Sequence, residues 1–89
     1  MDSTPEIEIV KTIRLYPNPV EYGRSIHIAV PEDVDMNKAR VEIYNEVGVL
    51  VHTEIFTGQA IDNNLAAGLY TVRIVETNGN AHYSKLIVK

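Results

Sequence analysis

Apolar and polar residues alternate along most of this chain. A period of two places apolar side chains on one face of a β-strand, so the alternation predicts strands that are buried on one side. The alternating sets are Ile7 and Ile9; Ile13 and Leu15; Ile26, Ile28 and Val30; Val41 and Ile43; and Tyr70, Val72 and Ile74. Residues 49–56 are rich in β-branched and aromatic types, and residues 81–88 form the last strand-like run. The pattern predicts about seven strands.

Glycine and proline separate these runs at the spacing typical of a small all-β domain. The segment nearest to a helical pattern is Glu32 to Arg40, but Pro31 precedes it and its apolar residues are sparse, so at most one helical turn fits there. Short turns between strands favour antiparallel pairing. We therefore predict an all-β fold, an immunoglobulin-like β-sandwich of about seven antiparallel strands in two sheets.

The dipeptide Asn78-Gly79 predicts a hairpin between the last two strands. Asn followed by Gly suits a type I′ turn, which needs positive φ at both central residues. The pairing places one set of side chains in the core, namely Tyr70, Val72, Ile74, Leu86 and Val88. It leaves Arg73, Lys85 and Lys89 facing water. The terminal hairpin is thus expected to present a basic face.

Length and composition narrow the function classes. A chain of 89 residues allows one small domain, and we expect a leader and the start of the first strand at residues 1–12 and the domain itself at residues 13–89. The net charge is −4 and the eight basic residues are scattered, which argues against nucleic-acid binding. There are no cysteines, and the polar, acidic start at Met1 to Glu6 is unlike a secretory signal; if the chain is exported, we expect the export signal to lie outside it.

Candidate catalytic and metal-binding residues do not form a known arrangement. His27, His52 and His82 fall on three different predicted strands. Asp33 with Asp35 begins like a calcium loop, but the positions that need glycine and a bidentate glutamate carry other residues. No serine has the context of a nucleophile, and no glycine loop precedes a helix. We predict neither an enzyme nor a bound cofactor or metal.

The ordered motifs of the chain are more informative. They are YPNPV at residues 16–20, Gly23 before SIHIAV, VEIYNEVGVLV with its turn at Gly48, NLAAGLYTVRI, and KLIVK at residues 85–89. In this order and at these separations, the chain resembles the type A C-terminal sorting domain of cargo proteins of the Bacteroidetes type IX secretion system. The resemblance covers roughly Ile13 to Lys89.

The resemblance implies that the domain is a secretion signal at the end of a larger precursor. An N-terminal cargo domain would precede it, the outer-membrane translocon would recognise it, and a sortase-like cysteine protease would usually cleave it off and attach the cargo to anionic lipopolysaccharide. The precursor would pass through the periplasm and end at the outer membrane, at the cell surface or outside the cell.

Motif matching assigns the candidate residues. The recognition candidates are Gly68, Leu69, Tyr70, Val72, Ile74, Lys85, Leu86, Ile87, Val88 and Lys89, and the family motif near the start is Tyr16, Pro17, Asn18 and Pro19. The expected processing region is Ser3, Thr4, Pro5 and Glu6, because an extended acidic leader is accessible to a protease. Some recognition candidates must also be core residues.

Two further possibilities remain open at this stage. The domain could instead be an immunoglobulin-like binding or spacer module that a surface adhesin or hydrolase retains. An unpaired strand edge in the terminal hairpin could accept a translocon strand, and a strand edge could also support a weak homodimer.

Overall fold

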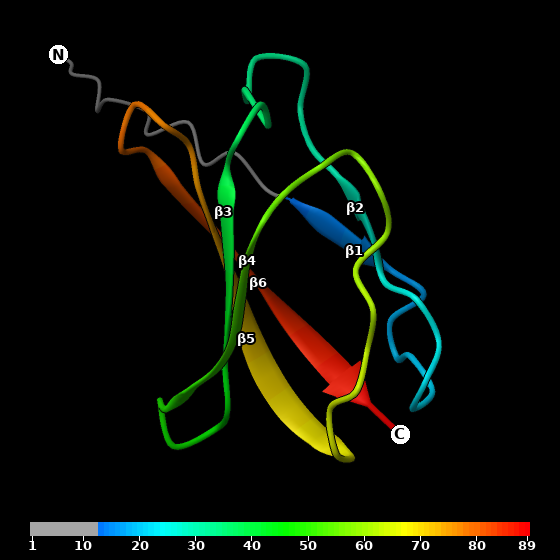
Figure 1. Cartoon of the computed structure of the whole chain (residues 1–89). Coiled ribbons are helices and arrows are strands. Elements are labelled where there is room, and N and C mark those ends of the chain that lie inside the picture. The colour runs from blue at the N-terminus through cyan, green and yellow to red at the C-terminus, as the bar shows by residue number, and fades with distance from the viewer. Residues whose placement is uncertain (1–12) are drawn as a thin grey trace, which may run out of the picture.

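The computed structural model describes residues 13–89, and these residues form six β-strands (Figure 1). The strands are β1 (Arg14–Tyr16), β2 (His27–Ala29), β3 (Arg40–Tyr44), β4 (Leu50–Ile55), β5 (Gly68–Val75) and β6 (Ala81–Val88). β1 and β2 form one antiparallel pair, and the other four form an antiparallel sheet in the order β4-β3-β5-β6. The all-β sandwich is confirmed.

The described residues contain six strands, where the whole chain was predicted to have about seven. The predicted strand at Ile7 and Ile9 lies outside them. The other six predicted strands correspond to β1–β6, and two further segments pair for one residue only, at the Ile26–Ile61 and Val20–Val88 bridges. Residues 31–39 form turns without a helix, as their proline and aspartates favour.

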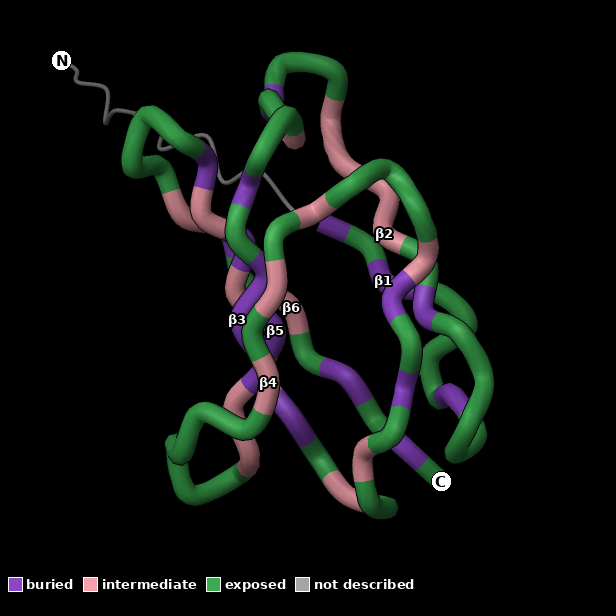
Figure 2. The backbone as a smooth tube through the Cα atoms, in the orientation of Figure 1, coloured by how far each residue is buried: buried purple, intermediate pink, exposed green. Residues whose placement is uncertain are grey.

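The core lies between the two sheets, where the buried residues of both face one another (Figure 2). Its members are Ile13, Leu15, Val20, Ile26, Ala39, Val41, Ile43, Ile61, Tyr70, Val72, Ile74, Leu86 and Val88. The two-stranded sheet is too small to cover the larger one alone. The loop between β4 and β5 completes the cover, because Ile61 exchanges two backbone hydrogen bonds with Ile26 at 2.9 Å each.

The hairpin between β5 and β6 is confirmed, but its type I′ turn is wrong. Asn78 does not have positive φ, whereas Gly79 has φ +95°. The Gly79 N–H donates to the carbonyl of Glu76 at 2.9 Å, and the Glu76 N–H donates to Asn80 at 2.8 Å. This is a three-residue loop whose glycine adopts the left-handed conformation. It needs positive φ at one residue instead of two.

The register of this hairpin places its side chains as the alternation predicts. Tyr70 pairs with Leu86, and both are buried, while Leu69 opposite Ile87 and Thr71 opposite Lys85 lie on the outer face. Arg73 is the exception to the predicted basic face. Its guanidinium is partly buried and bonds to Glu42 on the neighbouring strand β3, so it does not simply face water.

Candidate recognition site along the C-terminal strand

The Tyr16–Pro19 motif lies beside the last strand of the domain. The Tyr16–Pro17 and Asn18–Pro19 peptide bonds are both cis. Between the prolines, the Asn18 side chain meets β6: its Nδ2 donates to the carbonyl of Lys85 at 2.9 Å, and its Oδ1 accepts from the N–H of Ile87 at 3.0 Å. One side-chain amide thus bonds the strand edge as a neighbouring strand would.

The backbone after Pro19 continues this pairing. Val20 donates to the carbonyl of Ile87 at 2.8 Å and accepts from Lys89 at 2.8 Å, and Tyr22 donates to the carbonyl of Lys89 at 3.2 Å. Val20 is fully buried beneath this contact. We call the segment that these bonds cover, the C-terminal half of β6 together with Lys89 (residues 85–89), the closed edge. The two family motifs, far apart in the sequence, form one site.

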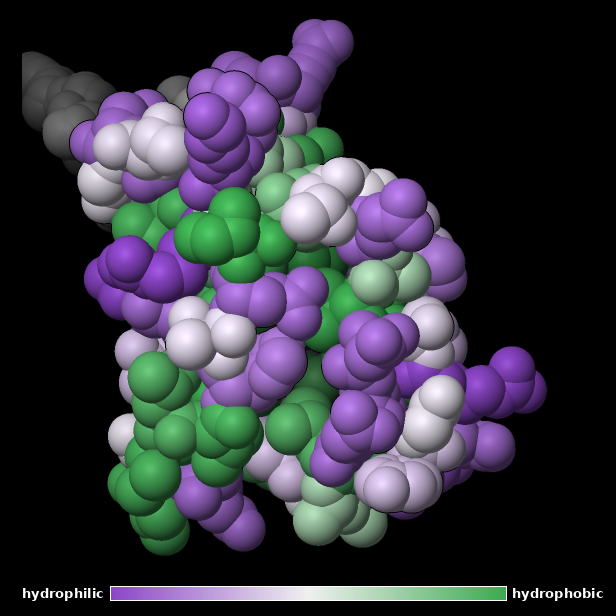
Figure 3. All heavy atoms as spheres, viewed as in Figure 1, coloured by the Kyte–Doolittle hydropathy of each residue, from purple (hydrophilic) through white to green (hydrophobic). Residues whose placement is uncertain are grey.

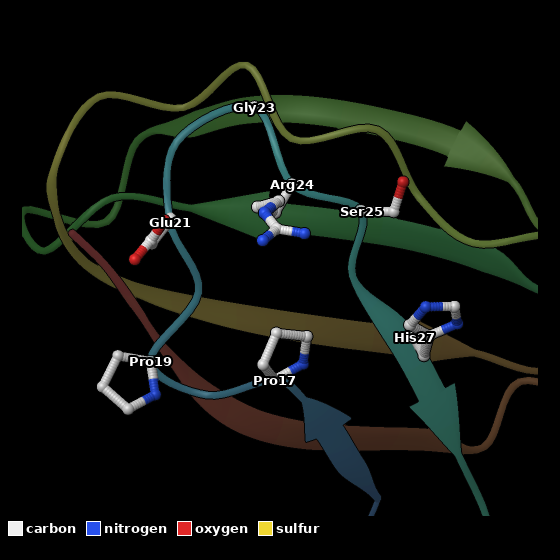
Figure 4. A pocket seen from close by; sticks show the side chains of 7 residues that line it. All are labelled: Pro17, Pro19, Glu21, Gly23, Arg24, Ser25 and His27. Carbon is white, nitrogen blue, oxygen red and sulfur yellow. The ribbon is translucent and has the colours of Figure 1, made fainter.

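An open cavity of about 550 Å³ adjoins the motif on the loop between β1 and β2 (Figure 4). Its lining consists of Pro17, Pro19, Glu21, Gly23, Arg24, Ser25 and His27. The His27 ring stacks on Tyr16 with ring centroids 5.2 Å apart. Buried Asn63 fixes the loop, since its Nδ2 donates to the carbonyl of Glu21 at 3.0 Å and its own carbonyl accepts from Gly23 at 3.1 Å.

A network of charged side chains crosses the outer face of the large sheet. The carboxylate of Glu42, on β3, accepts from Arg73 at 2.7 Å, from Arg40 at 2.9 Å and from the Tyr44 hydroxyl at 2.9 Å. The bond from Arg73 is the main cause that lowers the pKa of Glu42, and the Glu42 carboxylate in turn raises the pKa of Tyr44. Arg73 also bonds to Tyr83 on β6 at 3.2 Å. The network therefore ties β3, β5 and β6 together.

A second carboxylate, that of Glu76, is buried next to the start of β6, at the β5–β6 turn. Glu76 Oε2 lies 2.6 Å from His82 Nε2, and both side chains are nearly inaccessible. Glu76 Oε1 accepts the backbone N–H of Asp35 at 3.1 Å. The bond with His82, followed by the one from Asp35, lowers the pKa of Glu76. This pair holds the 31–39 loop on the β5–β6 hairpin.

The structure separates the recognition candidates into two groups. Those with buried side chains are Tyr70, Val72, Ile74, Leu86 and Val88. Leu69, Lys85, Ile87 and Lys89 are exposed, and Gly68 is intermediate. Lys85 bonds through Nζ to the Thr71 hydroxyl at 3.1 Å and remains accessible. Only the exposed group is available to a partner without unfolding. The processing candidates Ser3, Thr4, Pro5 and Glu6 lie outside the described residues.

Sequence reasoning missed two residues of this region, Asn63 and Glu42, and the contacts of a third, Asn18. The motif located Asn18, but its bonds to β6 depend on a contact between residues 67 and 69 positions apart. Asn63 and Glu42 are polar residues that lie buried in the fold, and no spacing in the sequence marks them. The strand placement of Glu42 beside Arg73 follows from the β3–β5 register, which links strands that are not neighbours in the chain.

Within residues 13–89, no group of three or more His, Cys, Asp or Glu side chains is placed to hold a metal ion. His27, His52 and His82 lie on β2, β4 and β6, on separate strands as predicted. No helix in this part of the chain is long and apolar enough to cross a bilayer.

The fold and the site describe a small β-sandwich in which a proline motif is bonded to the last strand. Comparison with known families shows which family the sequence belongs to. Residues 14–89 match the family described as secretion system C-terminal sorting domain, and the chain belongs to this family. It is a C-terminal signal of the type IX secretion system, and it directs export to the cell surface or secretion. The resemblance drawn from the sequence motifs is confirmed.

One curated relative illustrates the context of such a domain. The chain is similar to the endo-acting ulvan lyase of Formosa agariphila, with 27% identity over 85 residues. The alignment covers 91% of this chain and 16% of that protein, so most of the lyase consists of other sequence. No solved structure gives a significant match.

Proposed function

We propose that the translocon reads a composite surface, formed by the exposed residues of β6 together with the Asn18 segment that closes its edge. The observation that carries the proposal is the pair of bonds from the Asn18 amide to Lys85 and Ile87. These bonds join both family motifs in one place. The exposed recognition candidates on this surface are Lys85, Ile87 and Lys89, and exposed Leu69 of β5 lies opposite Ile87.

The closed edge changes the way in which a partner strand could bind. Backbone groups of Lys85, Ile87 and Lys89 already have partners in the chain, so strand addition there requires displacement of residues 18–22. Recognition by side chains on the outer face needs no displacement. We therefore favour recognition of the folded domain through its side chains.

For the steps other than recognition by the translocon, we propose those that are expected of the family. An N-terminal cargo domain precedes this tail in the precursor, and a sortase-like cysteine protease cleaves within residues 1–12 and transfers the cargo to anionic lipopolysaccharide. The chain spans 16% of the curated relative that it matches, which is consistent with a tail on a much larger cargo. The retained binding module is the less favoured alternative, because the family is one of sorting signals.

A reporter fusion tests the signal itself. Residues 1–89 are appended to a periplasm-directed fluorescent protein in a bacterium with a working type IX system, beside a strain that lacks the translocon. Surface or medium fluorescence in the competent strain alone is expected. Periplasmic retention in both strains, with the domain folded, would contradict the proposal and favour a retained module.

Substitution of the two exposed lysines tests the recognition surface. Lys85→Ala combined with Lys89→Ala should reduce export severalfold while it changes the free energy of unfolding by less than about 1 kcal/mol in total. Lys38→Asn is the matched control, because it removes an exposed cation elsewhere and asparagine tolerates the positive φ of that position. Unchanged export in the double variant would show that the translocon does not recognise the two lysines.

A further inference from the structure

The opposite end of the large sheet has an unusual edge strand. Half of the exposed large hydrophobic residues of the described chain lie on β4 and the turn before it: Val47, Val49, Leu50, Val51 and Ile55. Val47 is 78% exposed. Figure 3 shows hydrophobic surface gathered at the β3–β4 hairpin, at its lower left. Natural edge strands usually carry charge or proline that blocks pairing, and this one carries few such groups.

The backbone of β4 also has free hydrogen-bonding groups. The Phe56 N–H donates to Ala39 at the end of β3, at 2.8 Å. In an antiparallel pair, successive residues point their N–H and C=O groups to opposite sides, so those of Ile55 and Thr53 point away from β3. Within residues 13–89, no strand lies on that side of β4. We call this side the open edge.

The sequence of the open edge is complementary to itself. His52 and Glu54 flank Thr53 and lie on the same side of the sheet, and their side chains bond at 2.7 Å. If two copies of β4 pair antiparallel about Thr53, His52 of each chain lies opposite Glu54 of the other. That pair is of the type without backbone hydrogen bonds, in which side chains approach most closely.

We propose that the open edge binds the β4 strand of a second copy of this chain, with Thr53 opposite Thr53 of the partner subunit. The Thr53 N–H and C=O supply two symmetric backbone bonds. Two other registers use the same outward-pointing backbone groups, with Thr53 opposite residue 51 or residue 55 of the partner subunit. They are less favourable, because they place His52 opposite His52 or Glu54 opposite Glu54 of the partner subunit. The register shift at Val51 keeps the paired stretch short. The dimer is therefore weak, and it does not depend on the sorting role.

Proline substitution tests the backbone bonds. Thr53→Pro removes an N–H that β3 does not use, so the domain should remain folded. Thr53→Val, which keeps the N–H, is the matched control. Sedimentation velocity of the 89-residue chain, up to millimolar concentration, should show a monomer–dimer equilibrium whose dissociation constant rises at least about tenfold with proline and little with valine. A chain that is monomeric throughout would overturn the proposal.

Charge exchange tests the register. His52→Glu and Glu54→His should each weaken the dimer, because like groups then face across the axis, and the double variant should restore it. Thermal unfolding of each variant at low concentration verifies that the monomer is folded. Failure of the double variant to restore a dimer that both single variants lose would overturn this register.

A single cysteine provides a geometric test, since the chain has none. Opposed residues in a hydrogen-bonded antiparallel pair have Cα atoms about 5.5 Å apart, within the range of a disulfide. Thr53→Cys should therefore oxidise to a disulfide dimer much faster than Val47→Cys, which is more exposed but lies away from the axis. Equal rates would overturn the pairing. The dimer proposal would also be overturned if the chain is monomeric and its Thr53→Pro variant is no longer exported. That result would indicate that a translocon strand binds the open edge.

Discussion

The two edge strands of the large sheet, β6 and β4, differ in what covers their outer side. At one end, residues 18–22 form five hydrogen bonds with the closed edge, through the Asn18 amide and the backbone of Val20 and Tyr22. At the other end, β4 presents apolar side chains, and no strand within residues 13–89 pairs with its outer side. A domain of this size could have protected both edges by the same means. Within residues 13–89, the strand with the family motif is covered at its edge and β4 is not, and for this reason we propose different partners for the two edges.

The largest difference is expected between the same substitution on the two edge strands. Leu86, on β6, is fully buried, so Leu86→Ala should lower the free energy of unfolding by about 2–5 kcal/mol. Leu50, on β4, is 46% exposed, and Leu50→Ala should cost less than about 0.5 kcal/mol. Urea denaturation measures both. Similar losses would mean that β4 is buried in solution, as a tight oligomer would make it.

Removal of the Asn18 amide should open the closed edge. Asn18→Ala loses two hydrogen bonds to β6 and should cost about 1–3 kcal/mol. The amide of Ile87 should exchange with solvent faster, which nuclear magnetic resonance can follow. Asn64→Ala, at an exposed asparagine in the loop before β5, is the control and should have little effect. If Ile87 remains protected in Asn18→Ala, Val20 and Tyr22 alone hold the edge.

A decrease in pH should have a smaller effect near neutrality than the Leu86→Ala or Asn18→Ala substitution. It acts on the N-terminal half of β6, which Asn18 does not contact. His82 and the Asp35 N–H lower the pKa of Glu76 in the folded state. Its contribution is thus present above the ordinary carboxyl pKa of about 4.3 and is lost as the pH falls through the lower folded value. Urea titrations between neutral pH and about pH 3 should show stability falling with acid, and falling less steeply in Glu76→Gln. Equal slopes would assign the acid sensitivity to other groups, of which Glu42 has the same sign.

The sequence predicted the strands well where alternation was regular. β5 and β6 have a clear period of two and a turn signal between them, so their pairing, their buried face and the exposed lysines could be anticipated. The turn type could not, because Asn-Gly suits both a two-residue and a three-residue loop, and strand alignment decides between them. The predicted strand count exceeds the observed one by the strand at Ile7 and Ile9, which lies outside the described residues, whereas the one-residue bridge of Ile61 to Ile26 was not predicted because no alternation marks residue 61.

The candidate site was predicted in its parts and not as a whole. Motifs located Asn18 and Lys85 to Lys89, but nothing local indicates that they touch. The position of Arg73 was predicted correctly on the outer face, and its partner Glu42 was not anticipated because β3 and β5 pair across an intervening strand in the chain. Contacts of this kind depend on the topology of the sheet.

The bonds between residues 18–22 and the closed edge couple translation to folding. The carbonyl of Lys85, the N–H and carbonyl of Ile87, and the N–H and carbonyl of Lys89 belong to the residues of the matched segment 14–89 that are synthesised last. Until they emerge, Asn18, Val20 and Tyr22 lack their partners, and Val20 has no strand to cover it. A precursor truncated before Lys85 would therefore lack a finished signal. The two motifs are thus joined only after residues 85–89 have been synthesised, so the complete folded signal requires a chain that contains both.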